Sequence, residues 1–194
     1  PSVFKREVAY TLNQKNNNGI NNPRWLDQDT IIYGSATLAS INSRHQDLFS
    51  WHLPTNTVKQ LTKSANIRRF DISNDGQYII AERNRFGYSQ LVKVSLSPSS
   101  MGQVTAELTQ KSLEHVYDFP RLRPTSDGKS SDSFAYVSST LNNKWQLKVR
   151  QLNNDQEVII PLPENYQFLS FPEWSKDGEV LYFVAGLDSA FFNS

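Results

Sequence analysis

Three aspartates recur at matching places in the sequence and are the first candidates for acid–base chemistry. Asp75, Asp127 and Asp177 each precede a glycine, and each Asp-Gly pair comes before a strand-like apolar run. General acid–base catalysis needs titratable groups that are placed together, whereas recurrence in every copy of a repeat indicates a shared turn. An Asp side chain can bond to the backbone two residues on and hold such a turn. We therefore predict that these carboxylates are structural.

Histidine and serine form no recognisable metal or nucleophile motif. His45, His52 and His115 fall in different strand or loop contexts, and none belongs to a His-x-His or His-Glu-x-x-His pattern. The nearest approach to a Gly-x-Ser-x-Gly elbow surrounds Ser189 and lacks the second glycine. The chain has no cysteine and no glycine-rich phosphate loop. We expect no catalytic, cofactor-binding or metal-binding residue, and hence a module that is not an enzyme.

The most basic stretch could bind an acidic partner. It consists of Arg68, Arg69, Arg83 and Arg85, followed by the aromatic segment 86–88. A cluster of this size is also typical of a solvated sheet edge. Both interpretations stay open, although short loops between strands are common places for partners to bind.

Charge and composition exclude some classes of function. Over 194 residues, 20 Lys and Arg balance 19 Asp and Glu, which leaves a net charge of +1. A nucleic-acid binder would need a basic stripe to neutralise phosphates, so we expect no nucleic-acid contact. No apolar run approaches the length of about 18 residues that crosses a membrane, so we expect no membrane contact either.

Four copies of one pattern run along the chain. Each copy has an apolar anchor, a short polar turn and then a run rich in Ile, Tyr, Phe and Val. The anchors Trp25, Ile72, Leu122 and Trp174 are 47, 50 and 52 residues apart. Asp-Gly between apolar runs is a strong hairpin signal. We predict that Trp25 and Trp174 lie in the core and that Trp145, on a later strand, can pack between repeats.

Two further strands follow in each complete copy. Period-two alternation predicts the third strands, at 47–53, 90–96 and 145–152. Shorter apolar runs predict the fourth strands, at 58–62, 104–109 and 157–162. No segment has a convincing helical period. Four antiparallel strands that repeat every 40 to 50 residues predict an all-β chain with the blades of a β-propeller.

The strand count predicts an incomplete arc of a larger propeller. We expect an outer strand and lead-in at 1–20, blades at 21–66, 67–116 and 117–166, and the first strands of a further blade at 167–194. The sequence starts with Pro and stops where a third strand would begin, which suggests a piece of a larger propeller of six or more blades. Alternatively, the alternating segment 4–12 closes a four-bladed ring. An open arc would expose strand edges and favour self-association.

The repeat resembles the TolB-like β-propeller repeat from Asn21 to Ala185. The shared features are Phe-Pro-x-Trp-Ser-x-Asp-Gly, a β run and a terminal Leu-Thr. The matching residues are Phe171, Pro172, Trp174, Ser175, Asp177 and Gly178, with Ser73, Asp75, Gly76, Leu61-Thr62 and Leu108-Thr109 in earlier copies. Such repeats occur in many unrelated extracytoplasmic proteins, so the resemblance indicates a fold more than a function.

The resemblance implies a non-enzymatic binding or scaffold module in the bacterial periplasm, with a protein partner. Two alternatives follow from related propellers. One is the periplasmic sensor domain of a membrane-anchored winged-helix regulator of the CadC type. The other is the substrate-gating propeller of a prolyl-oligopeptidase-type serine peptidase, whose catalytic domain would lie outside this chain.

Overall fold

Every regular element in the described part of the chain is a β-strand. The computed structural model describes residues 19–40, 43–125, 131–141, 145–163, 166 and 168–186. These residues form three four-stranded antiparallel sheets and one two-stranded sheet. The all-β prediction is therefore confirmed. The segment 4–12, the Asp127 turn, the loop at 142–144 and the region around Ser189 lie outside the described residues.

Each sheet is a simple meander of strands that follow one another in sequence. The first sheet holds β1 (Asn21–Trp25), β2 (Thr30–Ser40), β3 (Ser43–His52) and β4 (Thr57–Gln60). The second holds β5 (Ile67–Ile72), β6 (Tyr78–Arg85), β7 (Tyr88–Ser95) and β8 (Val104–Glu107). The third holds β9 (His115–Leu122), β10 (Ser133–Thr140), β11 (Trp145–Gln151) and β12 (Glu157–Ile159). The last holds β13 (Phe168–Trp174) and β14 (Leu181–Gly186).

The Ser-x-Asp-Gly turns are built by the same hydrogen bonds in two copies. The Ser73 hydroxyl donates to Asp75 Oδ1 (2.6 Å) and accepts from the backbone of Tyr78 (3.0 Å), while Asp75 Oδ1 accepts from Gln77 (3.1 Å). Ser175 and Asp177 repeat this arrangement, with bonds of 2.6 and 3.1 Å to the aspartate. Both aspartates therefore hold turns, as their recurrence predicts.

In two sheets, a Leu-Thr pair just after the fourth strand forms hydrogen bonds with the third strand of the same sheet. Thr62 Oγ1 accepts a hydrogen bond from the backbone of Leu48, and Thr109 Oγ1 accepts one from the backbone of Leu91, both at 2.9 Å. In the third sheet Ile160 occupies the place of the leucine and donates its backbone N–H to Leu147 (2.9 Å). The threonine thus satisfies a buried backbone donor that the short fourth strand does not reach.

The core lies between consecutive sheets. Ile32 and Leu48 of the first sheet pack with Phe70, Ile79 and Val92 of the second. Tyr78, Ile80 and Leu91 contact Leu122, Phe134 and Tyr136 of the third sheet, and Val137 and Leu147 contact Leu169 of the last. Because each sheet buries side chains on a neighbour, the sheets stack face to face, as propeller blades do.

The tryptophans follow the predictions only in part. Trp145 packs edge-to-face on Phe168, with ring centroids 5.1 Å apart, so its predicted place between repeats is confirmed. Trp25 is 61% exposed, so its predicted place in the core is wrong. The anchors Ile72 and Leu122 pack on the preceding sheet. Trp25 belongs to the first described sheet, which has no preceding sheet among the described residues.

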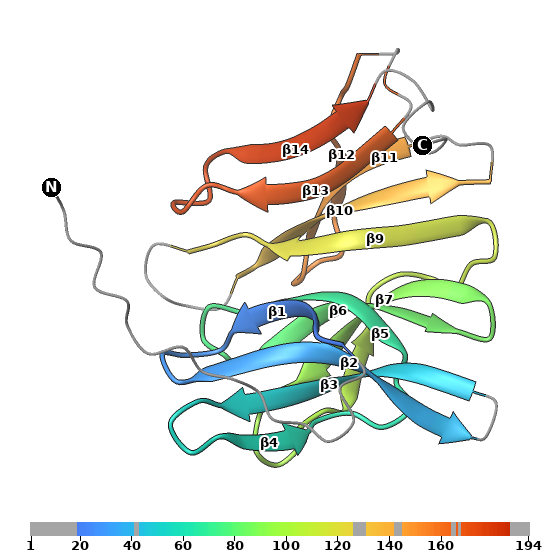
Figure 1. The fold of residues 1–194 in the computed structure, drawn as a ribbon. Helices are drawn as coiled ribbons and strands as arrows, with labels where there is room; N and C mark the ends of the chain where they lie inside the picture. Colours follow the sequence, from blue (N-terminus) through green and yellow to red (C-terminus); the bar gives the residue numbers. More distant parts are fainter. Residues whose placement is uncertain are drawn as a thin grey trace, which may run out of the picture.

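The sheets form an open arc. The first strands of successive sheets, β1, β5, β9 and β13, are neighbours. Figure 1 shows the two-stranded sheet β13–β14 at the opposite end of the molecule from β3 and β4. The structure is therefore an incomplete β-propeller, and the inner strands of its blades lie side by side.

Candidate functional site

A β-bulge recurs in all four inner strands. The pairing register shifts between Asn21 and Arg24, and at matching places in β9 and β13, while in β5 it shifts one residue earlier, between Ile67 and Phe70. Three residues before the anchor, Asn22, Phe119 and Phe171 have φ values of 48°, 53° and 49°. A bulge bends the strand and redirects its side chains. Around Arg69 in β5 and Asp118 in β9, the side chains therefore do not follow the regular alternation of a β-strand.

The residue just before each anchor is charged, and the sign alternates along the arc: Arg24, Asp71, Arg121, Glu173. Arg24 lies 3.6 Å from Asp71, and Arg121 lies 3.1 Å from Glu173. Asp71 also accepts a hydrogen bond from the backbone of Leu122 (2.9 Å). Burial raises the pKa of Asp71, against the effect of the neighbouring arginines. This row of charges connects consecutive inner strands.

Glu82, on β6, is a fully buried carboxyl that faces the third sheet. Its Oε1 accepts a hydrogen bond from Asn84 Nδ2 (2.9 Å) and lies 3.5 Å from the Arg68 guanidinium. Its Oε2 is buried, and the described residues offer it no hydrogen-bond donor. Burial, then the negative charge of Asp118, raises the pKa of Glu82 to about 8, against the effects of Arg68 and Asn84.

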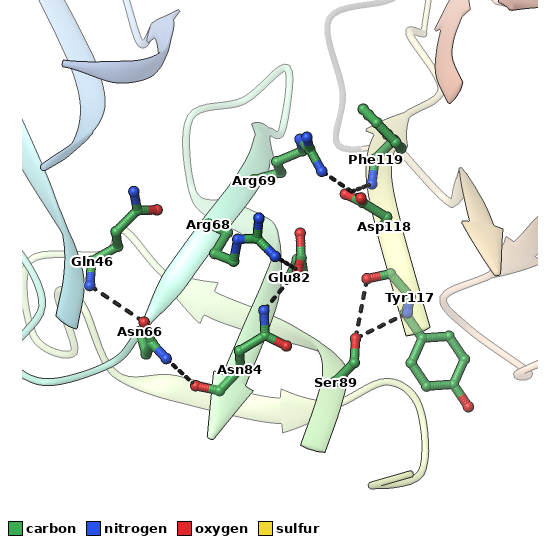
Figure 2. Close-up of polar contacts among 10 residues, drawn as sticks. All are labelled: Gln46, Asn66, Arg68, Arg69, Glu82, Asn84, Ser89, Tyr117, Asp118 and Phe119. Carbon is green, nitrogen blue, oxygen red and sulfur yellow. Dashed lines mark hydrogen bonds and ion pairs between the residues drawn. The ribbon is translucent and has the colours of Figure 1, made fainter. Parts of the chain in front are cut away.

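Asp118, on β9, is held beside Glu82 by contacts between the two sheets. The Ser89 hydroxyl, on β7, accepts from the backbone N–H of Tyr117 (2.9 Å) and donates to its carbonyl (3.2 Å). Asp118 itself accepts from the backbone of Phe119 (2.7 Å) and pairs with Arg69. Figure 2 shows Arg68, Arg69, Glu82 and Asp118 together where β5, β6 and β9 meet.

The two neighbouring arginines differ in their surroundings. Arg69 pairs with Asp118, and its guanidinium lies 4.0 Å from the centre of the Phe119 ring. The Arg68 side chain is 54% exposed, and among the described residues its ion-pair partner is Glu82. Contacts within the protein therefore hold the Arg69 guanidinium, while the Arg68 guanidinium retains N–H donors for a ligand.

A polar hollow of about 280 Å³ lies next to these arginines. Its lining residues are Asn21, Asn22, Gln46, Arg68 and Arg69. Asn66 connects the lining residue Gln46 to the second sheet. The Asn66 Oδ1 accepts a hydrogen bond from the backbone of Gln46 (3.4 Å), and the Asn66 Nδ2 donates one to the Asn84 carbonyl (2.5 Å). Among the described residues, this lining consists of amide and guanidinium side chains, so the hollow suits an anion. We call it the anion hollow.

A second hollow, of about 170 Å³, lies beside the β6–β7 hairpin. Its lining residues, the hairpin patch, are Arg83, Arg85, Phe86, Tyr88, Gln90, Glu107 and Lys111. Phe86 and Gly87 form the tip, with φ values of 52° and 81°. Phe86 is 82% exposed, and the Arg85 guanidinium lies 5.1 Å from its ring centre. Glu107 pairs with Arg83 (2.9 Å) and Lys111 (3.6 Å).

The structure divides the basic stretch expected from the sequence. Arg68 and Arg69 line the anion hollow, whereas Arg83 and Arg85 line the hairpin patch. Glu82 and Asp118 were not singled out in the sequence, because only the folded chain brings the second and third sheets together. The alternating charges before the anchors are visible in the sequence once the copies are aligned, so that signal was available.

The histidines do not come together. His45 and His52 lie on β3, where His52 Nδ1 is 2.7 Å from the Thr55 hydroxyl, and His115 begins β9. In the described part of the chain, no group of three or more His, Cys, Asp or Glu residues could hold a metal ion. A search of the same residues for a long apolar helix able to cross a membrane found none.

Comparison with known proteins gives structural matches only. The chain matches no family model and no curated protein sequence. Solved structures that resemble it include a putative TolB from Agrobacterium tumefaciens, with a TM-score of 0.61, 18% identity, and coverage of 86% of this chain and 58% of that one. An uncharacterized protein from Listeria monocytogenes matches with a TM-score of 0.59 and 13% identity, and the match covers 94% of this chain and 55% of that one.

A third match is the β-propeller domain of the Trilobed protease from Pyrococcus furiosus, with a TM-score of 0.55, 14% identity, and coverage of 81% and 46%. The fold is that of a β-propeller. The chain spans about half the length of each of these three solved chains. At these identities the likeness concerns the fold, so function has to be argued from the residues.

Proposed function

We propose that this chain is a non-enzymatic, protein-binding propeller module of an extracytoplasmic bacterial protein, and that the hairpin patch is its contact surface. The observation that carries the proposal is Phe86, a large aromatic side chain that stands exposed at a hairpin tip in a left-handed conformation. The likeness to TolB structures supports the extracytoplasmic, periplasmic location.

A phenylalanine at this tip has no evident structural purpose. The β6–β7 turn has positive φ at both central residues, which Asn, Asp or Gly adopt most easily. A bulky residue in this conformation costs about 1–2 kcal/mol. Because Phe86 is also exposed, burial does not offset this strain. Strained residues that persist are often found at functional sites, where they contact a ligand or partner.

The charge around Phe86 indicates the chemistry of the partner. The patch holds three cationic side chains, Arg83, Arg85 and Lys111, and one carboxylate, Glu107, so it carries excess positive charge. Exposed aromatic and arginine side chains are the types that most often dominate binding energy at protein interfaces. An acidic segment with an apolar side chain, which would contact Phe86, would complement this surface.

Site-specific photocrosslinking in the intact protein, expressed in its host, tests this proposal. A photoreactive phenylalanine analogue replaces Phe86, and the matched control carries it at Met101, an exposed residue in the turn at the other end of β7. We expect a discrete crosslinked partner at position 86 that the variant Arg85→Glu loses. Equal products at both positions, or none at 86, would refute the hairpin patch as the contact surface.

A second candidate is the gating propeller of a peptidase. The likeness to the propeller domain of the Trilobed protease supports this candidate. In that case the catalytic domain would lie elsewhere in a longer protein. Labelling of the intact protein with a serine-reactive fluorophosphonate probe would support the gate, and absence of labelling would favour the binding module. The periplasmic sensor interpretation stays a prediction.

A further inference from the structure

We propose that the anion hollow binds an oxyanion group, a carboxylate or a sulfate- or phosphate-like group, through Arg68, and that proton binding at Glu82 controls this binding. This inference goes beyond the proposed function, because it concerns a different surface from the hairpin patch and requires no protein partner.

The hollow has the size and lining for such a group. A water molecule takes about 30 Å³ in the liquid, so the hollow of about 280 Å³ has room for an oxyanion with part of its hydration. The amides of Asn21 and Gln46 line the hollow together with the two guanidiniums. No carboxylate lines the hollow within the described residues, so a bound anion meets no negatively charged side chain of this lining.

Arg68 is the residue that can make the main contact. Its guanidinium lies 3.5 Å from Glu82, beyond the usual length of a charge-assisted hydrogen bond. Its neighbour Arg69 is held by Asp118 and the Phe119 ring. An arginine that is half exposed and loosely paired can turn its fork toward a carboxylate or sulfate with little rearrangement.

The groups that face Glu82 decide when Arg68 is available. They are Arg68 on β5, Asp118 on β9 and the amide of Asn84 on its own strand, while its partner on β7 is the apolar Leu91. With a pKa of about 8, Glu82 is mostly neutral at pH 7, so the Arg68 charge is uncompensated. When Glu82 loses its proton, it holds Arg68 and competes with the ligand. Anion affinity therefore falls as pH rises.

Two probes test the site in the intact protein. Sodium sulfate and sodium acetate both keep a constant charge from pH 6 to pH 9, and sodium chloride holds the ionic strength constant. Binding is followed by the NMR signal of the Arg68 Nε–H group. We expect saturable binding at pH 6 and affinity about tenfold weaker at pH 9, since about nine-tenths of Glu82 is then ionised if its pKa is about 8. Stronger binding of acetate identifies a carboxylate ligand, and stronger binding of sulfate identifies a tetrahedral one.

Three variants separate the inference from general attraction of anions, each read with the NMR signal of the Gln46 backbone. Arg68→Gln should lose binding, while Lys59→Gln, which removes an exposed positive charge on β4, should keep it. Glu82→Gln should bind equally at pH 6 and pH 9. Absence of saturation with both probes, unchanged binding in Arg68→Gln, equal loss in Lys59→Gln, or persistent pH dependence in Glu82→Gln would each overturn the proposal. If Glu82→Gln does not fold, a pH titration of the wild type tests the proposal instead. The chemical shift of the Arg68 Nε–H group should then change with a midpoint near pH 8.

Discussion

At the scale of single residues, two buried acids differ in the hydrogen-bond donors that surround them. Asp47 accepts hydrogen bonds from Thr62 Oγ1 and from the backbone of Ser64 and Ala65, at 2.9 to 3.0 Å. Glu82 accepts one hydrogen bond from Asn84 and faces another carboxyl. Several donors hold the Asp47 side chain in place, whereas burial and the neighbouring Asp118 carboxyl raise the pKa of Glu82.

The stability of the fold should therefore decrease with pH through Glu82. Its pKa is raised from 4.5 to about 8, so the folded state binds more protons than the unfolded state between these values. The stabilisation is complete below pH 4.5 and is lost as pH rises through about 8. Urea unfolding at pH 5 and pH 9 should show this loss in the wild type and little of it in Glu82→Gln. A control, Glu114→Gln, changes an exposed acid and should behave as wild type.

Phe86 should show a trade-off between stability and binding. Replacing it by Asn, which tolerates positive φ, should raise the unfolding free energy by about 0.5–1 kcal/mol and abolish the partner contact. Replacing it by Ala removes the same ring but keeps a strained residue, so stability should stay near wild type while binding is lost. Thermal melts combined with the interaction assay check both results, and a less stable Phe86→Asn would contradict the strain argument.

At the scale of elements, the threonine that follows the fourth strand of a sheet should matter more than a threonine on that strand. Thr109→Val keeps the shape of the side chain but leaves the buried N–H of Leu91 without an acceptor. We expect a loss of about 1–3 kcal/mol in unfolding free energy. Thr105→Val, on exposed β8, should change it by less than about 0.5 kcal/mol. Chemical denaturation of both variants makes the comparison, and equal effects would contradict the role of Thr109.

Local elements were predictable from the sequence, and contacts between elements were not. The turn at Ser73 depends on residues close in sequence, and the bond from Leu91 to Thr109 lies within one sheet of consecutive strands, which is why both repeat patterns could be interpreted. The position of Trp25 depends on whether another sheet packs on it, which the repeat alone does not reveal. Glu82 and Asp118 are 36 positions apart and meet across two sheets, so no spacing rule would pair them.

At the scale of the whole molecule, the arc exposes apolar side chains at both ends. In β14, Leu181, Phe183 and Ala185 pack on the third sheet, while the alternate residues Tyr182 and Val184 are 61% and 53% exposed. At the other end Trp25 is exposed as well. The apolar end of one copy can therefore contact the different apolar end of a second copy, head to tail. Such contacts continue to add copies unless the assembly closes into a ring.

The isolated 194-residue chain should therefore self-associate through its two ends. Light scattering over a concentration series should show a mass that grows with concentration. Val184→Lys and Trp25→Glu change opposite ends, and each should stop the growth, because a head-to-tail contact needs both ends. Lys59→Glu, an exposed change on β4, should leave the growth unaffected. A compact monomer at every concentration would contradict the open ends as interfaces and favour the four-bladed ring closed by segment 4–12.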